Sequence, residues 1–372
     1  DAKKVDMSLL RPDWDLPVKV HLGEGLMEQY RPNGTVVVLA DPNAVQLPLR
    51  LKLETRLQDQ IVQWFWQTHE ECELSHLASL AQPIWQALDS SHDVRLMAIG
   101  GGTTLDIAKI LRWRPRQSLN ESEVLNVWRS QGQKLTSDWV RHVLSCWPST
   151  AGTGSEVSAS ATIWDKSNDR PQKLSWQPQH GHADEAWVDS SLTQSCPIKV
   201  TRDCALDALA HALESLWNVH ANPITRLFAN RAAQLVIKNL PIALSSAHDR
   251  PARAALSEAS LLAGMAMSQT QTALAHALSY DLTLKEGIPH GEAVAIWLPM
   301  VTKMACQSEP SFSEELQSLF GTRSEPSEHL SNWLKALGVR PRNLEDLPDG
   351  QADVEIALQS PRGLNQLRRL RN

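Results

Sequence analysis

Asp207 and His211 are the residues of this sequence whose types and spacing most directly suggest chemistry. They lie four residues apart in Thr201–Trp217 (TRDCALDALAHALESLW), which has the pattern of a helix, so their side chains stand one turn apart on the same face. On its own, such a pair is usually a surface or capping pair. Here Ala and Leu make the helix apolar nearly all round, so both side chains should be buried. Buried ionisable groups are unfavourable unless they are paired or bound to a metal.

Two further histidines complete a possible ligand set. His276 and His290 occur in AHALSYDLTLKEGIPHGEA, and His276 is also surrounded by Ala and Leu. One carboxylate and three imidazoles suit a divalent transition metal. From these features alone, a metal site and a set of ordinary helix residues remain comparable interpretations.

A glycine-rich turn is the second candidate for chemistry. The apolar run Val94–Ile99 predicts a strand, which enters Gly100-Gly101-Gly102-Thr103-Thr104 and is followed by the helical stretch LDIAKILRW. Free N–H groups at such a helix start can bind a phosphate. We expect Thr103 or Thr104 to cap the helix and Asp106 to lie in its first turn. The alternative is simply a tight turn, because this is not the G-x-G-x-x-G fingerprint.

A third polar cluster follows the apolar run VLSCW. It reads Pro148-Ser149-Thr150-Ala151-Gly152-Thr153-Gly154-Ser155-Glu156, and open α/β sheets bind ligands in such loops at the carboxyl ends of strands. A solvated turn is the alternative interpretation.

The order of apolar segments predicts two domains. Thr35–Ala40 predicts a buried strand that ends at Asp41, with a helical stretch near residues 45–50, and strands alternate with helices through the first half. From about Thr201, Ala/Leu-rich helical segments dominate. We therefore expect an N-terminal α/β domain with a Rossmann-like parallel sheet over residues 1–196 and an all-α domain over residues 197–372. The active site should lie in the cleft between them.

Composition bounds the class of protein. The 372 residues carry a net charge of −6 and are 42% hydrophobic, which is typical of a globular chain and gives no basic surface to attract nucleic acid. No stretch approaches the roughly 20 apolar residues of a membrane span, and the first residues lack an apolar signal core, so we expect a cytoplasmic protein. The five cysteines are odd in number and form no C-x-x-C pair, so we expect reduced thiols.

Four motifs together resemble a known family. IGGGTTLDIAK, PSTAGTGSEVS, DALAHALES and HALSYDLTLKEGIPHGEA are similar, in this order, to the signatures of the iron-containing (group III) alcohol dehydrogenases, and the resemblance covers about Val36 to Met304. It implies the two-domain architecture that this family shares with dehydroquinate synthase, and a homodimer or larger homo-oligomer.

The resemblance also implies residue roles. The metal ligands would be Asp207, His211, His276 and His290. The acidic residue that accepts the adenosine ribose hydroxyls would be Asp41, where a carboxylate favours NAD(H) over NADP(H). The remaining cofactor-binding positions would be Gly101, Gly102, Thr103, Asp106, Ser149, Thr150, Thr153, Ser155 and Lys173.

One departure from the family pattern concerns proton transfer. Many relatives carry a histidine four residues after the third ligand, and here that position is Tyr280. A phenol can relay a proton within a network, but its pKa near 10 suits the task differently. Tyr280 is therefore a candidate catalytic residue in place of the usual histidine.

The implied reaction is hydride transfer between a primary alcohol or aldehyde and nicotinamide, with Fe(II), or alternatively Zn(II), polarising the substrate oxygen. The sequences of these motifs most resemble the branch of phosphonoacetaldehyde reductases, or hydroxyethylphosphonate dehydrogenases. A phosphonate would need a cationic partner. Lys285 and Arg226 are candidates, although each is more typical of an exposed solubilising charge.

Two other classes of function stay open. A lyase similar to dehydroquinate synthase, or a sugar or polyol enzyme on the same fold, also combines NAD with a metal, but a dehydroquinate synthase site is rich in Lys and Arg whereas the segments around these ligands are mostly apolar. A catalytically silent metal- or nucleotide-binding protein is the other alternative. The only feature that suggests it is Tyr280 in place of the family's usual histidine.

Overall fold

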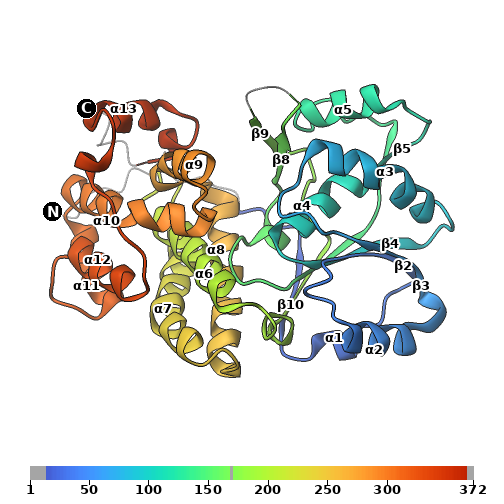
Figure 1. The fold of residues 1–372 in the computed structure, drawn as a ribbon, viewed down its shortest axis with the longest axis horizontal. Coiled ribbons are helices and arrows are strands. Elements are labelled where there is room, and N and C mark those ends of the chain that lie inside the picture. The colour runs from blue at the N-terminus through green and yellow to red at the C-terminus, as the bar shows by residue number, and fades with distance from the viewer. Residues whose placement is uncertain (1–13, 168–170, 367–372) are drawn as a thin grey trace. The chain divides into compact units, whose positions relative to one another are not determined.

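The computed structural model describes residues 14–167 and 171–366, which group into two compact units (Figure 1). The α/β unit comprises Pro17–Thr150 and Ser155–Cys196, and the helical unit comprises the described residues from 197 onwards, Ala151–Gly154 and residues 14–16. One boundary between the units follows Cys196, and residues 151–154 group with the helices. Their backbone packs closely there, since a Cβ on Gly152 would lie 2.7 Å from Cys204 Cβ.

A six-stranded parallel sheet forms the centre of the α/β unit. Its strand order is β1-β10-β7-β4-β2-β3, and each neighbouring pair is parallel. Its strands are β1 (Lys19–Gly23), β2 (Thr35–Ala40), β3 (Ile61–Trp66), β4 (Val94–Gly100), β7 (Leu144–Pro148) and β10 (Glu185–Asp189). Two antiparallel pairs flank it: β5 (Trp113–Pro115) with β6 (Trp139–Arg141), and β8 (Ala161–Asp165) with β9 (Gln172–Trp176).

Helices cover both faces of this sheet (Figure 1). Alternate residues of β2 face opposite cores, because successive side chains of a strand point to opposite sides. Val37 and Leu39 pack with one set of helices, and Val36 and Val38 with the other. The first set is α3 (Leu74–Leu88), α4 (Gly102–Leu111) and α5 (Glu121–Arg129), and the second is α1 (Leu26–Gln29) and α2 (Leu47–Leu57). The predicted α/β class is thus confirmed, although α2 extends beyond the predicted helical stretch.

The helical unit is built around α6 (Ile198–Leu216), whose residues from Ala205 to Leu216 are all buried. Its apolar residues share one core with those of the surrounding helices. Those helices are α7 (Pro223–Ser245), α8 (Arg250–Thr270), α9 (Leu274–Glu286), α10 (His290–Ser308), α11 (Ser311–Phe320), α12 (Pro326–Ala336) and α13 (Gln351–Gln359), followed by the 3₁₀ turn η6 (Gly363–Asn365).

Among the described residues, no helix combines the length and the apolar character that crossing a bilayer requires. None of the five cysteines forms a disulfide.

Candidate functional site

The four predicted metal ligands come together in the helical unit from three helices. Asp207 and His211 lie one turn apart on α6, His276 lies near the start of α9, and His290 is the first residue of α10. The Nε2 atoms of His211, His276 and His290 lie 3.6, 3.5 and 3.8 Å from Asp207 Oδ1. Three imidazoles thus face one carboxylate oxygen.

These four side chains have the chemistry of a transition-metal site. Ligand atoms of Asp207, His276 and His290 lie within 4.8 Å of one another, and the His211 ring stacks on the His276 ring at 4.9 Å between centroids. Asp207 Oδ1 and His276 Nε2 are buried without a hydrogen-bond partner among the described residues. Buried polar atoms are rarely left unsatisfied, so a cation ligated by both accounts for their arrangement. The residues present therefore fit a divalent metal.

The sequence analysis missed Glu214, which holds His276 in place. Glu214 is fully buried on α6, and its Oε2 lies 2.7 Å from His276 Nδ1. Its carboxylate also accepts the backbone N–H groups of Ala273 at 2.6 Å and Ala275 at 2.6 Å. A carboxylate on Nδ1 leaves the Nε2 lone pair facing Asp207, as is common behind metal-bound histidines. The available signal was a second acidic residue, three positions after His211, inside an apolar helix.

Electrostatics in this cluster favour the charged carboxylates. Burial alone raises the pKa of Asp207, but the neighbouring histidines, His211 foremost, outweigh it and hold that pKa well below its usual range. Burial likewise raises the pKa of Glu214, and His276 with the backbone N–H groups lowers it below its ordinary value. Burial lowers the pKa of His276, but Glu214 and Asp207 outweigh it and raise that pKa, so the two carboxylates favour a positive charge here, which a bound metal ion would supply.

Tyr280 lies one helical turn beyond His276 on α9, at the predicted catalytic position. Burial raises the pKa of its phenol, and the positive charge of Arg362 lowers it by less, so the hydroxyl is protonated at neutral pH. The Arg362 guanidinium carbon lies 5.2 Å from the centroid of the Tyr280 ring. Arg362, close to the C-terminal end of the described chain, is the second residue that the sequence analysis missed.

Neither predicted phosphonate partner has a free charge. Lys285 is exposed and pairs with Asp281 at 2.8 Å. Arg226 donates to the Leu216 carbonyl at 2.6 Å and pairs with Glu315. Both cations already have partners within the protein.

In the α/β unit, three predicted cofactor positions lie at one edge of the sheet. Asp41 follows β2, Gly101 follows β4 and Ser149 follows β7, and these strands are neighbours. The Asp41 N–H donates to the Ile99 carbonyl at 2.9 Å, and the Ser149 N–H donates to the Gly100 carbonyl at 2.9 Å. The carboxyl edge of the sheet therefore carries the predicted ribose and phosphate positions together.

The start of α4 differs in detail from the prediction. The helix begins at Gly102 with Gly101 as N-cap and no capping side chain, so neither Thr103 nor Thr104 caps it. The Thr103 hydroxyl instead donates to the Glu70 carbonyl at 2.8 Å. Because the helix begins three residues earlier than predicted, Asp106 lies in its second turn. An uncapped start leaves backbone N–H groups for an anionic ligand.

Asp106 and Ser155 bind each other. Ser155 Oγ donates to Asp106 Oδ1 at 2.6 Å, and the Thr162 N–H donates to Asp106 Oδ2 at 2.8 Å. The fully buried Lys109 pairs with Asp106 at 3.2 Å and donates to the Ser155 carbonyl at 3.0 Å. This network fixes the 155–162 segment against α4, which gives both predicted cofactor residues a positioning role.

The remaining cofactor predictions fall in different places. Thr150 is half-buried beside Gly101, and its Oγ1 would lie 3.3 Å from a Cβ at that glycine. Thr153 belongs to Ala151–Gly154, which groups with the helical unit. Lys173 lies on β9, with its Nζ 5.6 Å from the centroid of the Trp164 ring.

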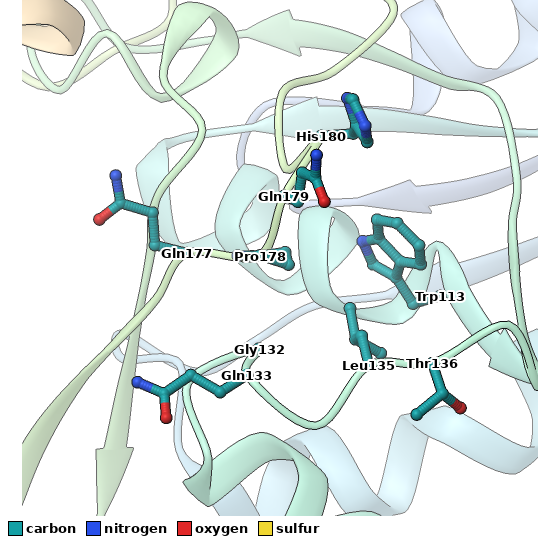
Figure 2. A pocket seen from close by; sticks show the side chains of 9 residues that line it. All are labelled: Trp113, Gly132, Gln133, Leu135, Thr136, Gln177, Pro178, Gln179 and His180. Atoms are coloured by element: carbon teal, nitrogen blue, oxygen red, sulfur yellow. The ribbon is translucent and has the colours of Figure 1, made fainter.

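A pocket elsewhere in the α/β unit is not the candidate site. It has a volume of about 410 Å³, and Figure 2 shows Trp113 and His180 among its lining residues. Its walls contain no carboxylate, a single imidazole and none of the predicted site residues.

Comparison with known proteins identifies the family of the chain. The family model for iron-containing alcohol dehydrogenase matches residues 17–190, and that for the C-terminal part of the Fe-containing alcohol dehydrogenase family matches residues 201–359. The 1-propanol dehydrogenase PduQ of Citrobacter freundii is 30% identical over 77% of this chain and 72% of its own length. The probable alcohol dehydrogenase EutG of Salmonella typhimurium is 33% identical over 69% of this chain, which spans 62% of that protein's length.

Two sulfoacetaldehyde reductases are also similar. That of Bilophila wadsworthia is 29% identical over 70% of this chain and 65% of its own length. The solved structure of the Bifidobacterium kashiwanohense enzyme in complex with NAD+ has a TM-score of 0.81 over 95% of this chain and 94% of that chain, at 24% identity, and shows the same fold. The chain belongs to the iron-containing alcohol dehydrogenase family.

Proposed function

We propose that this protein is a metal-dependent, NAD(H)-linked alcohol dehydrogenase or aldehyde reductase acting on a short aldehyde and its primary alcohol. The observation that carries the proposal is the convergence of three imidazoles on the buried, unpartnered Asp207 Oδ1. Asp207, His211, His276 and His290 would hold Fe(II), the family expectation, or Zn(II). When bound, such a metal supplies a Lewis acid for the substrate oxygen.

The chain's own residues would orient the cofactor. The N–H groups at the uncapped start of α4 suit the pyrophosphate, and Gly101 and Gly102 allow its close approach. Asp41 would accept the adenosine ribose hydroxyls and repel a 2′-phosphate, which favours NAD(H) over NADP(H). The other predicted contacts are Thr103, Ser149, Thr150, Thr153 and Lys173.

Tyr280 would serve proton transfer. Its phenol is protonated at neutral pH, so it can donate a hydrogen bond to the substrate oxygen or to a water that exchanges a proton with it. Asp106 and Ser155 act through each other by holding the loop beside α4.

Phosphonoacetaldehyde is the substrate that we propose within this class. The sequences of the motifs favour it, and the similarity to sulfoacetaldehyde reductases supports a two-carbon aldehyde with an anionic head group. A neutral short aldehyde such as propanal, the product type suggested by the 1-propanol dehydrogenase relative, is the competing substrate.

The test is NADH consumption by metal-free protein reconstituted anaerobically with Fe(II) or Zn(II), against phosphonoacetaldehyde, sulfoacetaldehyde and propanal. We expect metal-dependent net NADH oxidation, and its loss in His211→Ala. His248→Ala is the matched control, because His248 is an exposed histidine of the same unit. Binding of metal and NADH without net oxidation of NADH by any of the aldehydes would overturn the proposal and favour a lyase, which recycles its cofactor, or a silent binder.

A further inference from the structure

We propose that Arg362 binds the anionic head group of the aldehyde substrate and thereby sets a preference for negatively charged over neutral aldehydes. This inference deepens the proposed function and rests on it. It assigns the cationic partner to a residue that the sequence motifs do not include.

Arg362 contacts two residues that flank the ligand His276 in the sequence. Its Nη1 donates to Thr272 Oγ1 at 2.8 Å, and its guanidinium carbon lies 5.2 Å from the Tyr280 ring centroid. Thr272 and Tyr280 stand four residues before and four residues after His276. The guanidinium is therefore held between Thr272, just before α9, and Tyr280, the candidate proton donor on α9.

The turn that carries Arg362 is firmly anchored. Asn365 Nδ2 donates to the Thr272 carbonyl at 2.8 Å, and the Val219 N–H donates to the Asn365 carbonyl at 2.9 Å. Gly363 is buried, and a Cβ there would lie 2.5 Å from Leu358 Cα, so the turn packs directly on the end of α13. A cation fixed before the substrate arrives loses little conformational entropy on binding.

The charge of Arg362 is available to a ligand. Its guanidinium has five N–H donors, of which Thr272 takes one, and no carboxylate among residues 14–167 and 171–366 forms a salt bridge with it. Three other cations of this unit have carboxylate partners: Arg202 pairs with Asp203 and Glu292, Arg342 pairs with Glu286, and Lys285 pairs with Asp281.

Planar guanidinium groups bind phosphonate and sulfonate oxygens through paired, charge-assisted hydrogen bonds. In the proposed arrangement, the carbonyl of a two-carbon aldehyde faces the metal cluster while its anionic group faces Arg362.

The test compares kcat/KM for phosphonoacetaldehyde, sulfoacetaldehyde and propanal in the wild type, Arg362→Gln and Arg362→Lys. The loss of charge-assisted hydrogen bonds should lower kcat/KM for both anionic aldehydes about 10- to 100-fold, mainly through KM. Propanal should change by less than about twofold, because it makes no use of the charge. The Lys variant should retain part of the preference. Arg340→Gln, which removes an exposed arginine of the same unit, is the matched control.

The possible outcomes separate the inference from the proposed function. If Arg362→Gln lowers turnover of charged and neutral aldehydes alike, Arg362 is a structural residue and the inference is wrong. The same holds if the substitution lowers the melting temperature without a selective loss of activity toward the anionic aldehydes. If the wild type reduces propanal as well as the anionic aldehydes and Arg362→Gln does not change the ratio, the inference also fails while the dehydrogenase function stands. If the wild type with bound metal oxidises NADH with none of the three, the proposed function itself fails.

Discussion

Replacing Glu214 by glutamine should weaken both the metal site and the helical unit. The Glu214 carboxylate faces four N–H groups: Oε1 accepts those of Ala275 and His276, and Oε2 accepts Ala273 N–H and lies 2.7 Å from His276 Nδ1. A glutamine amide offers one acceptor and one NH2 donor. Either orientation of the amide sets that NH2 against two of these groups, so two of the four hydrogen bonds are lost.

The size of the effect follows from this count. Each buried group left unsatisfied costs about 1–3 kcal/mol, so the free energy of unfolding of the metal-free protein should fall by about 2–6 kcal/mol. His276 can relieve one conflict by moving its proton to Nε2, but that nitrogen faces Asp207 and is then lost as a ligand. Metal affinity should accordingly fall about 10- to 100-fold.

The assay is a competition titration of metal against a chelator, together with urea unfolding of the metal-free protein. Glu258→Gln is the matched control, because Glu258 is a glutamate of the same unit whose partner, Arg231, is exposed. We expect wild-type affinity and stability for the control. A Glu214→Gln protein that binds metal as tightly as the wild type and unfolds at the same urea concentration would refute the role assigned to Glu214.

Three further predictions concern the α/β unit. Burial raises the pKa of Glu156 from its ordinary 4.5 to about 7, so the folded state binds a proton more tightly than the unfolded state, and the free energy of unfolding falls as pH rises through this range. Between pH 5 and pH 8, Glu156→Gln should remove up to about 3 kcal/mol of the fall in the free energy of unfolding measured with urea. An unchanged pH dependence would contradict this. Gly101→Ala places a Cβ 3.3 Å from Thr150 Oγ1 at a permitted φ of −75°, so the melting temperature should change little. The KM for NADH should rise about tenfold, because the added methyl group obstructs a phosphate at this turn, and an unaltered KM would contradict phosphate binding there. Asp41→Asn keeps an acceptor for the Asn43 N–H but removes the charge, so the ratio of kcat/KM for NADPH to that for NADH should rise about tenfold, and a constant ratio would show that Asp41 does not select the cofactor.

The sequence predicted the sheet well because its central strands are runs of apolar, often β-branched residues. The strand Thr35–Ala40 was predicted with both ends correct, and the strand from Val94 extends one residue further than predicted. The start of α4 was wrong by three residues. Glycine was taken as part of the turn, whereas Gly102 already has helical geometry and no side chain marks the cap.

The ligand set was predictable in part from the residues themselves. Asp207 and His211 share a face of an apolar helix, and both are buried as expected. His276 and His290 were proposed as ligands from their residue type and then matched to the family motifs, since residues 69 and 83 positions beyond Asp207 cannot be placed beside it by spacing.

The missed residues share a physical reason. Glu214 acts through a side chain contact with His276 on another helix, and Arg362 reaches Tyr280 from a turn 82 residues further along the chain. Such contacts depend on tertiary packing and leave little periodic signal in the sequence.

Four side chains of the helical unit should together form one metal site. Anomalous diffraction at the iron edge, from crystals of Fe(II)-loaded protein grown without oxygen, would locate the bound ion. We expect one strong peak per chain, bounded by the Asp207 carboxylate and the imidazoles of His211, His276 and His290, and no such peak in Asp207→Ala crystals. A peak at other ligands, or wild-type protein that binds no iron, would contradict it.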